Sequence, residues 1–558
     1  MKTLQARIRG FTTLLAFQPI LSIAGLILSA SSASAEVRAD LNTVALSGMA
    51  APGVSGATFA DLTISGPTIS PTGVVAFTAI LQGSTTNGGI FTSLSPGNLS
   101  LVVLQGANAP GTSGQFLTGN TSVPINPANE IAASGLLTNN RQGIWVGHPS
   151  ADTLVALSGN PAPLPGGFLF GTAPSAFSDY SPVLDWTGDV LFQTGLQNSS
   201  GQAISGAAVN WVEGGGAPPS AIARTGGPVN GYDPTASFTS LGSPGIALNS
   251  LVAYSGTFND PAAGIVNGSG IFAGAPGIQS PVAVTGGIAQ GVLNATFQTV
   301  GFRSTSTGSS VHVNVAGNTI FFGTITGPGV QQGVNDHGVW LSFGSIGFPA
   351  STLVARQGDQ VPGLPAGTMF SAFTDSGLGN GSAAILAQIS GPGIAAANNT
   401  GIWEGVPGNL HLFVRNGDSI ADGSNAPLMV NGLSHFTMNS IGDVIAQLSD
   451  NSIIGESTAG QLMVIARPGD SIQVAPGDFR TIQSIVTVAG GETSGGATAL
   501  NDMGLVTFTA TFTDGSMGTF VSSALAVPEP STVCLGALGA LVLLAARRRN
   551  ALARSANG

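Results

Sequence analysis

The sequence predicts an all-β protein, and three observations support that class. Glycine and proline account for 82 and 33 of its 558 residues, and both favour turns over helix interiors. Hydrophobic residues make up 43% of the chain and charged residues only 7%, a balance that argues against disorder. Short apolar strands, separated by glycine turns, recur along the whole body of the chain.

The first 35 residues are typical of a secretory signal peptide. Basic residues at the start are followed by an apolar run over 11–28 and by small residues before Glu36. Ala33 and Ala35 occupy the −3 and −1 positions that suit signal peptidase. We therefore expect export and cleavage after Ala35, which leaves a body at 36–526. The alternative is an uncleaved membrane anchor.

The chain ends in three segments at 527–558. The motif Val527-Pro528-Glu529-Pro530 precedes an apolar segment at 531–546, and Arg547-Arg548-Arg549 then open a basic tail at 547–558. As a membrane helix, the apolar segment would span about 24 Å, which is short of a hydrocarbon core of about 30 Å. The arginine cluster should stay on the cytoplasmic side as a basic stop.

These three segments resemble the PEP-CTERM sorting family, in which a Pro-Glu-Pro motif, a short membrane span and a basic end close the chain. The resemblance implies processing by an exosortase, a transpeptidase-like membrane enzyme of Gram-negative bacteria that produce exopolysaccharide. It also implies export across the inner membrane, transient anchoring through the C-terminal helix, and a final place at the cell surface or outside the cell. The alternative is a plain C-terminal anchor, which also leaves the body facing outward.

The body contains a repeated unit that begins with an apolar strand entering a tight turn, as at 353–358. The next strand carries an aromatic residue, and proline-glycine pairs often stand between the two. The turn glycine recurs at Gly48, Gly106, Gly159, Gly226, Gly286, Gly358, Gly417 and Gly469. The aromatic residue recurs at Phe59, Phe116, Phe168, Phe238, Phe297, Phe370, Phe436 and Phe479.

Each unit continues with two further strands. The third follows an Asn-x-x-Gly turn and carries a phenylalanine, as in 314–321 and 501–508. The fourth begins with glycine, an apolar residue and an aromatic, as in 401–403, whereas 210–211 and 453–454 are irregular. The third strand resembles the tandem-repeat proteins with an NxxGxxxF signature, which carry assorted anchors, PEP-CTERM among them. That resemblance implies no particular activity.

Four short strands repeated eight times are typical of β-propeller blades. We expect about eight blades, or seven if the third or seventh unit is an insertion. If each blade begins at the Asn-x-x-Gly strand, the chain starts with two strands, at 44–46 and 59–62, that complete the blade begun at 505–510 and 518–522. This two-plus-two pairing would leave no free sheet edge. An open β-solenoid or tandem β-sandwiches are alternatives, because repetition alone does not establish closure.

The charge distribution excludes a nucleic-acid partner. The net charge is −11 and each end carries +3, which leaves −17 for the body, and the body contains no lysine. Such a surface repels nucleic acid and anionic lipid, which bind clustered lysine and arginine. The single cysteine, Cys534, lies in the C-terminal apolar segment, so the body contains no disulfide bonds.

The sequence contains no recognisable catalytic set, and we expect no metal and no cofactor. The histidines form neither an HExxH motif nor a pair at ligand spacing. Carboxylates recur beside turn glycines, at Asp359, Asp418 and Asp470. They would either line a rim and bind a cation or cap their own turns, and we favour caps. The five histidines are His148, His312, His337, His411 and His435.

Two functions are compatible with these features. The first is a non-enzymatic scaffold at the cell surface that binds exopolysaccharide or other matrix components. The second is a propeller enzyme that acts on glycans, with acidic residues converging at the channel mouth. We favour the first, because the sorting tail and the repeats are present and a catalytic motif is not, although a propeller can gather a site from many loops.

Overall fold

The computed structural model describes residues 40–526, apart from 64, 86, 96–97, 120–122, 149–150, 172–181, 248–249, 303, 306–307, 310, 345–349, 424, 457–459 and 489–494. The chain divides into two compact units, Met1–Ala35 and Glu36–Gly558, and all described residues belong to the second. The predicted signal peptide and the predicted C-terminal helix lie outside the described residues. Between residues 40 and 526, the described segments include no helix long and apolar enough to cross a membrane.

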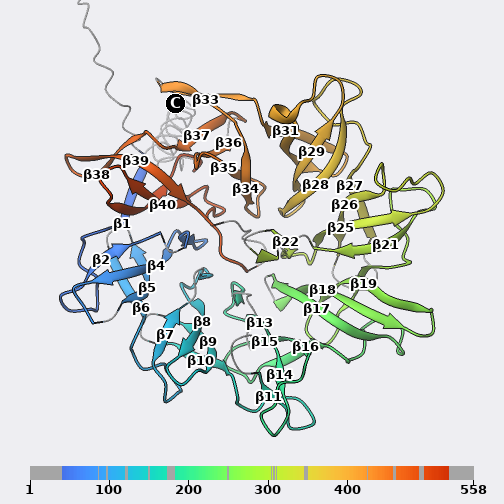
Figure 1. Ribbon diagram of the computed structural model, residues 1–558, viewed down its shortest axis with the longest axis horizontal. Helices are drawn as coiled ribbons and strands as arrows, with labels where there is room; N and C mark the ends of the chain where they lie inside the picture. Colours follow the sequence, from blue (N-terminus) through green and yellow to red (C-terminus); the bar gives the residue numbers. More distant parts are fainter. Residues whose placement is uncertain are drawn as a thin grey trace, which may run out of the picture. The chain divides into compact units, whose positions relative to one another are not determined.

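The body is an eight-bladed β-propeller, as the repeats predict. Eight antiparallel sheets surround a common centre, and the colours in Figure 1 pass around the ring in sequence order. The third and seventh units, irregular in sequence, each form a blade of their own. The alternatives of an open solenoid or a string of sandwiches are therefore wrong.

Blades one to four follow one another along the chain. Blade one contains β2 (Thr58–Asp61), β3 (Thr68–Ile69), β4 (Val75–Gln82), β5 (Gly88–Ser95) and β6 (Asn98–Leu104). Blade two contains β7 (Phe116–Gly119), β8 (Ile131–Leu137), β9 (Gln142–Gly147) and β10 (Thr153–Leu157). Blade three contains β11 (Leu169–Phe170), β12 (Val183–Leu184), β13 (Val190–Thr194), β14 (Leu196–Gln197), β15 (Val209–Glu213) and β16 (Ser220–Arg224). Blade four contains β17 (Ser237–Ile246), β18 (Val252–Asp260), β19 (Ile265–Gly274) and β20 (Ser280–Val284).

Blades five to eight complete the ring. Blade five contains β21 (Thr296–Gly301), β24 (His312–Val313), β25 (Thr319–Thr326), β26 (His337–Phe343) and β27 (Ala350–Arg356), with a small hairpin of β22 (Ser304–Thr305) and β23 (Gly308–Ser309). Blade six contains β28 (Met369–Leu378), β29 (Ala383–Ser390), a 3-10 turn η2 (Ala396–Asn398), β30 (Thr400–Val406) and β31 (Asn409–Arg415). Blade seven contains β34 (Leu433–Met438), β35 (Val444–Leu448), β36 (Ile453–Glu456) and β37 (Leu462–Ala466), after a hairpin of β32 (Ser419–Asp422) and β33 (Asn425–Met429). Blade eight contains β38 (Ser471–Ala475), β39 (Asp478–Val486), β40 (Val506–Phe512), β41 (Met517–Ser522) and β1 (Leu41–Leu46).

The ring closes through a single N-terminal strand. β1 pairs antiparallel with β41, with Leu41 opposite Ser522 and Leu46 opposite Gly518, and Figure 1 shows blue β1 beside the red strands of the last blade. The expected two-plus-two closure is wrong, because β2 pairs with β4 of blade one instead of with β1. The aromatic strand of each unit therefore opens the next blade. The closing sheet consists of four strands from the C-terminal part, β38 to β41, and the single N-terminal strand β1, so it joins the two ends of the body.

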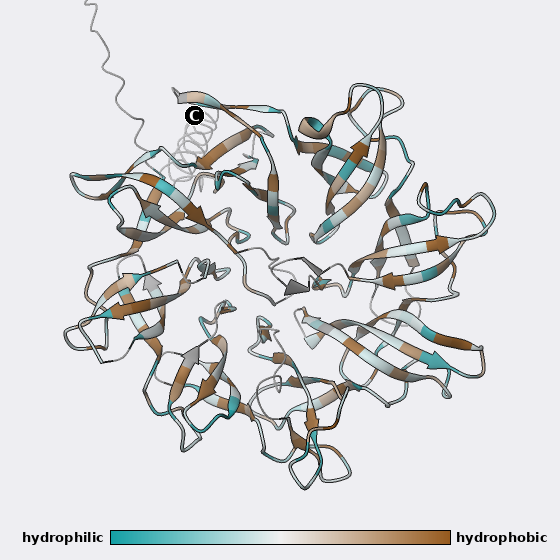
Figure 2. Ribbon diagram, viewed as in Figure 1, coloured by the Kyte–Doolittle hydropathy of each residue, from teal (hydrophilic) through white to brown (hydrophobic). Residues whose placement is uncertain are grey.

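Eight hydrophobic clusters fill the eight spaces between neighbouring blades. Between blades five and six, Ile320 packs in one cluster with Phe370 and Trp403. Between blades eight and one, Val44 shares a cluster with Phe59. Figure 2 shows hydrophobic residues along the strands of the blades. Because a fully buried apolar side chain stabilises a fold by about 1.5–3 kcal/mol, these clusters hold the ring together.

A glycine beneath an aromatic ring explains the Gly-Ile-Trp strand. Trp403 packs edge-to-face on Phe370, with ring centroids 5.2 Å apart. The indole lies over Gly401, where an added Cβ would come within 2.9 Å of the ring. Its N–H donates to the Pro362 carbonyl oxygen at 3.3 Å, in the loop that enters the same blade. The indole of Trp145 donates likewise to Pro110, and that of Trp340 to Gln290.

Blades three and seven depart from this arrangement because another residue replaces the glycine. In blade three Val209 stands at that position, and the Trp211 indole instead donates to the Thr194 hydroxyl at 2.7 Å. In blade seven Ser452 replaces the glycine and Ile454 replaces the aromatic residue. The smaller isoleucine leaves room for the serine side chain. Each irregular unit therefore packs this strand with a different pair of side chains at the glycine and aromatic positions.

The Asn-x-x-Gly turn fastens each blade that carries it to the next. The Asn501 side-chain oxygen accepts the backbone N–H groups of Met503 and Leu505, at 3.1 and 3.0 Å. Its amide nitrogen donates to the Ser70 carbonyl oxygen in blade one at 2.9 Å. The corresponding amides of Asn314 and Asn439 donate to Gly379 and Asn501 in the following blades. We refer to these cross-blade hydrogen bonds as the asparagine latches.

Candidate ligand-binding pocket between blades five and six

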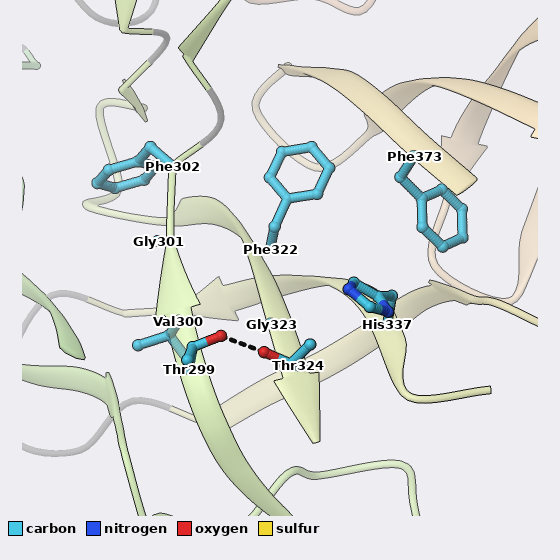
Figure 3. A pocket seen from close by; sticks show the side chains of 10 residues that line it. Thr299, Val300, Gly301, Phe302, Phe322, Gly323, Thr324, His337 and Phe373 are labelled. Atoms are coloured by element: carbon cyan, nitrogen blue, oxygen red, sulfur yellow. Dashed lines mark hydrogen bonds between the residues drawn. The ribbon is translucent and has the colours of Figure 1, made fainter. Parts of the chain in front are cut away.

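A hollow of about 250 Å³ opens between blades five and six. Three adjacent strands of blade five, β21, β25 and β26, form its wall, and Phe373 of β28 faces them from blade six, as Figure 3 shows. Strand register determines which side chains meet there. Gly301 lies opposite Phe322, and Thr299 lies opposite Thr324.

One edge of the pocket is a row of polar side chains. Thr299, Thr324 and His337 lie opposite one another on three neighbouring strands. The two threonine hydroxyls are hydrogen-bonded to each other, as the dashed line in Figure 3 shows. The His337 Nδ1 lies 2.9 Å from the carboxylate of buried Asp336, which orients the imidazole. This row offers hydroxyl and imidazole groups to a polar edge of a ligand.

The other side of the pocket is aromatic. Phe302 and Phe322 project beside one another, and Phe373 faces them across the hollow in Figure 3. Gly301 precedes Phe302 and lies opposite Phe322, and a Cβ placed on Gly301 would meet no atom within 4 Å. The missing side chain therefore leaves open space beside these two residues.

This combination suits a small ligand with apolar faces and hydroxylated edges. Aromatic rings pack on apolar faces, and threonine hydroxyls both donate and accept hydrogen bonds. The volume lies below the range of about 300–1,000 Å³ that holds drug-sized molecules, so one ring-sized unit fits. The ten lining residues include no carboxylate. The pocket is therefore equipped to bind and lacks the acid–base pair that hydrolysis of a glycoside requires.

A second hollow, of about 460 Å³, lies between blades two and three. Leucine, valine, alanine and proline side chains dominate its lining, and Asn160 is its one amide. It offers few polar groups that could orient a ligand. The pocket between blades five and six therefore has the better chemistry for selective binding.

The recurring carboxylates cap turns, as predicted. Asp418 accepts the backbone N–H of Arg415 at 2.8 Å, and Asp470 accepts that of Arg467 at 3.1 Å. Each hydrogen bond runs back to the end of the strand that precedes the turn. The arginine side chains also lie close, with Arg467 Nε 3.5 Å from Asp470. Burial raises the pKa of Asp359, and Arg356 opposes that rise.

The structure assigns the five histidines to separate surroundings. Burial lowers the pKa of His312 to about 4, and it also lowers the pKa of His435, whose Nε2 lies 3.0 Å from the Thr487 hydroxyl. The remaining three lie beside carboxylates, in the pairs His148–Glu130, His337–Asp336 and His411–Glu404.

The predicted sorting and processing residues lie outside the described part of the chain. They are the motif Val527, Pro528, Glu529 and Pro530, the basic stop Arg547, Arg548 and Arg549, and the cleavage positions Ala33 and Ala35. Their individual roles remain predictions.

The C-terminus carries the PEP-CTERM protein-sorting motif, matched over residues 526–549. This motif marks an exported protein that an exosortase processes for the cell surface or the extracellular space. Together with the closed ring of blades, it defines the class as exported, exosortase-processed β-propellers. The chain belongs to the family of unknown function DUF7453, whose model matches residues 28–140 and 121–534. Comparison with curated proteins found no match.

Several solved propellers are distantly similar. The Dos1 propeller is 10% identical, with a TM-score of 0.35, and the match covers 84% of this chain and 95% of that one. The β-propeller domain of the Trilobed protease from Pyrococcus furiosus is 10% identical, with a TM-score of 0.34 and coverage of 73% and 98%. Prolyl oligopeptidase B from Galerina marginata is 9% identical, with a TM-score of 0.36 and coverage of 74% and 51%. Likenesses at this level say nothing about the activity of this chain.

Proposed function

We propose that the protein is a non-enzymatic component of the extracellular matrix and that its propeller binds sugar units of an exopolysaccharide. The pocket between blades five and six supports this proposal, because three aromatic rings stand beside a row of hydroxyl and imidazole groups. The C–H faces of a sugar ring pack on aromatic faces, and its hydroxyl groups pair with threonine and histidine.

The charge of the body indicates the kind of polysaccharide. The body carries −17 when the two +3 ends are subtracted from the net charge of −11. A surface of this sign repels polyanions over the range of the Debye length. We therefore propose a neutral polysaccharide, recognised through one sugar ring at a time.

The alternative of a glycan-active enzyme is not supported at this pocket. Glycoside hydrolases usually place two carboxyl groups beside the scissile bond. None of the ten lining residues has a carboxyl group, and the nearby Asp336 is buried against His337. Binding without cleavage is therefore the function that we propose for this site.

Filling the pocket tests the binding proposal most directly. We expect Gly301→Leu to weaken binding of the producer's own polysaccharide at least tenfold in calorimetry, because the new side chain enters the open space of the pocket that Gly301 lines. Gly381→Leu is the matched control, since its Cβ also meets no atom within 4 Å. Equal affinity of wild type and Gly301→Leu would remove the sugar site from this pocket.

The export, processing and final location of the protein are tested separately. We propose that signal peptidase cleaves after Ala35, that an exosortase recognises Pro528 and Pro530, and that the C-terminal helix anchors the chain only transiently. A double Pro528→Ala, Pro530→Ala variant should be exported yet accumulate as an uncleaved membrane form in cell fractions. Deletion of 527–558 should send the body directly to the medium. Normal processing of the double variant would contradict the assigned role of the motif.

A further inference from the structure

In the described part of the chain, blades six and seven are joined without an asparagine latch and without an indole in the core between them. The core between them contains Phe436, but Ala446 and Ile454 occupy positions where blade six has aliphatic and indole side chains. Blade six also begins its turn with Gly379 instead of asparagine. Asn380 makes the link to blade seven there, through its backbone N–H to the Ser440 carbonyl oxygen and its side-chain amide to the Ser440 hydroxyl at 3.4 Å. Contacts other than an asparagine latch therefore hold part of the interface between blades six and seven together.

A cluster of three ligand-type side chains spans this interface. Glu404 ends the buried part of β30, His411 lies directly opposite it on β31, and Glu456 is the last residue of β36 in blade seven. The third strands of neighbouring blades run in the same direction, so their C-terminal ends meet on one face of the ring. One ligand atom from each residue lies within 4.8 Å of the others.

Only one oxygen of the buried Glu404 carboxyl group pairs with a described basic side chain. Glu404 is 7% exposed, and its Oε2 has no hydrogen-bond partner among the described residues. Its other oxygen lies 3.3 Å from the His411 Nε2. Two carboxylates facing each other at a buried position repel one another unless a proton or a cation lies between them. Burial, a hydrogen bond with Glu456 and the negative charges of Glu456 and Asp443 raise the pKa of Glu404.

Neighbouring groups do not provide the missing positive charge. The described ion pairs of the arginines nearest in sequence join Arg415 to Asp418 and Arg467 to Asp422 and Asp470. The Asp443 carboxylate already accepts the Asn439 amide at 2.9 Å. These described ion pairs bring no arginine to the two glutamates, so a cation held between them and His411 would neutralise both carboxylates.

We propose that Glu404, His411 and Glu456 bind one divalent transition-metal ion that staples blade six to blade seven. Two carboxylates and one imidazole form a mixed oxygen and nitrogen set, which suits Zn²⁺ or Mn²⁺ better than the all-oxygen shells of Ca²⁺ and Mg²⁺. Three protein ligands leave positions for water, because His411 is exposed and the cluster faces solvent on one side. This site is independent of the proposed sugar pocket.

The test uses the untagged full chain in mild detergent, freed of metal with a chelator and titrated with Zn²⁺ and with Mn²⁺. We expect one ion per chain in equilibrium dialysis and a rise in Tm on saturation, since an ion that binds only the folded state stabilises it. Glu404→Gln and exposed His411→Ala should each weaken binding at least tenfold and abolish the rise in Tm.

The control is His148→Ala, which removes the histidine of the His148–Glu130 pair in blade two. That variant should bind Zn²⁺ and shift in Tm as wild type does. Two results would overturn the proposal. One is a wild-type chain that binds neither ion at tens of micromolar, as expected if the glutamates share a proton. The other is binding that survives both Glu404→Gln and His411→Ala.

Discussion

Blade six and blade seven share a four-strand plan and are packed by different means. Blade six presents Trp403 and Phe370 to its neighbour, with the indole seated over Gly401. Blade seven presents Phe436 with Ile454 in place of the indole and Ser452 in place of the glycine. Both blades nevertheless occupy regular places in the ring. The difference shows that the ring requires a filled interface between blades and does not require an aromatic pair in each one.

The largest expected effect on stability comes from truncating the side chains at two equivalent positions, Trp403 in blade six and Ile454 in blade seven. Trp403→Ala should lower the free energy of unfolding by about 3–5 kcal/mol, because it leaves a cavity and an unpaired Pro362 carbonyl. Ile454→Ala should cost about 2–4 kcal/mol, because less volume is lost. Urea denaturation of the full chain measures both. A larger loss for Ile454→Ala would mean that the aliphatic interface is the more important one.

The asparagine latches should contribute nearly as much to the free energy of unfolding as the aromatic rings do. Asn501→Ala removes the acceptor for two backbone N–H groups and the donor to Ser70, all at a fully buried position. We expect a loss of about 2–3 kcal/mol, since buried polar groups left unpaired cost about 1–3 kcal/mol. Asn380→Ala serves as the comparison, because alanine retains the backbone N–H that links blade six to Ser440 and loses only a part-buried side-chain hydrogen bond of 3.4 Å. Equal losses for the two variants would argue against the latch.

Acid should weaken the interface between blades five and six through His312. Burial lowers the pKa of His312 from 6.5 to about 4, and a hydrogen bond with the Ser376 backbone partly opposes this shift. Because the folded pKa is the lower one, the unfolded chain takes up a proton first as the pH falls. Stability is therefore lost between about pH 6.5 and pH 4.

The measurement is the free energy of unfolding at pH 7 and at pH 5. His312 alone should lower it by on the order of 2 kcal/mol between these values, because one pKa unit corresponds to about 1.4 kcal/mol. His312→Gln carries no titrating group, so the drop should shrink by that amount. If the variant loses as much stability as wild type, other groups cause the acid sensitivity.

The smallest effect should come from the glycine beneath the indole. Gly401→Ala brings a Cβ to 2.9 Å from Trp403, so the ring must shift, at a cost of about 1–2 kcal/mol. Ser452→Ala, at the corresponding position of blade seven, lies under a smaller side chain and should be nearly neutral. In the double variant Gly401→Ala, Trp403→Ile, the added methyl should cost much less than it does beneath the indole. Thermal unfolding of wild type, these three variants and Trp403→Ile alone distinguishes these outcomes.

The repeats in the sequence were sufficient to predict the blades and their number. The positions of Phe370 and Trp403 predicted strands, because each recurs at a fixed place in every regular unit. Which sheet the aromatic strand joins was not predictable, since a repeated pattern is the same whichever strand is taken as the first. The two-plus-two closure was wrong for that reason, and the pairing of β1 with β41 corrects it.

The two candidate sites could not be derived from repeat spacing, because each gathers residues from neighbouring blades. Weak signals were nevertheless present. Phe321-Phe322 doubles the phenylalanine that other units carry singly, and the second ring lines the pocket. Glu404 follows Trp403 directly, at a place where other units carry Thr, Val, Ala, Leu or Gly. Departures from the pattern of a repeat are therefore where binding residues should be sought.

The strand that closes the ring imposes an order on maturation outside the cell. The Asp40 carboxylate accepts the Ser522 hydroxyl at 2.9 Å, although the two residues are 482 positions apart. A chain that is threaded outward from its N-terminus delivers β1 first and β41 last, so β1 has an open edge until translocation is nearly finished. Polypeptides truncated before β41 can never acquire this partner. The sorting motif lies shortly after the strand whose arrival closes the ring.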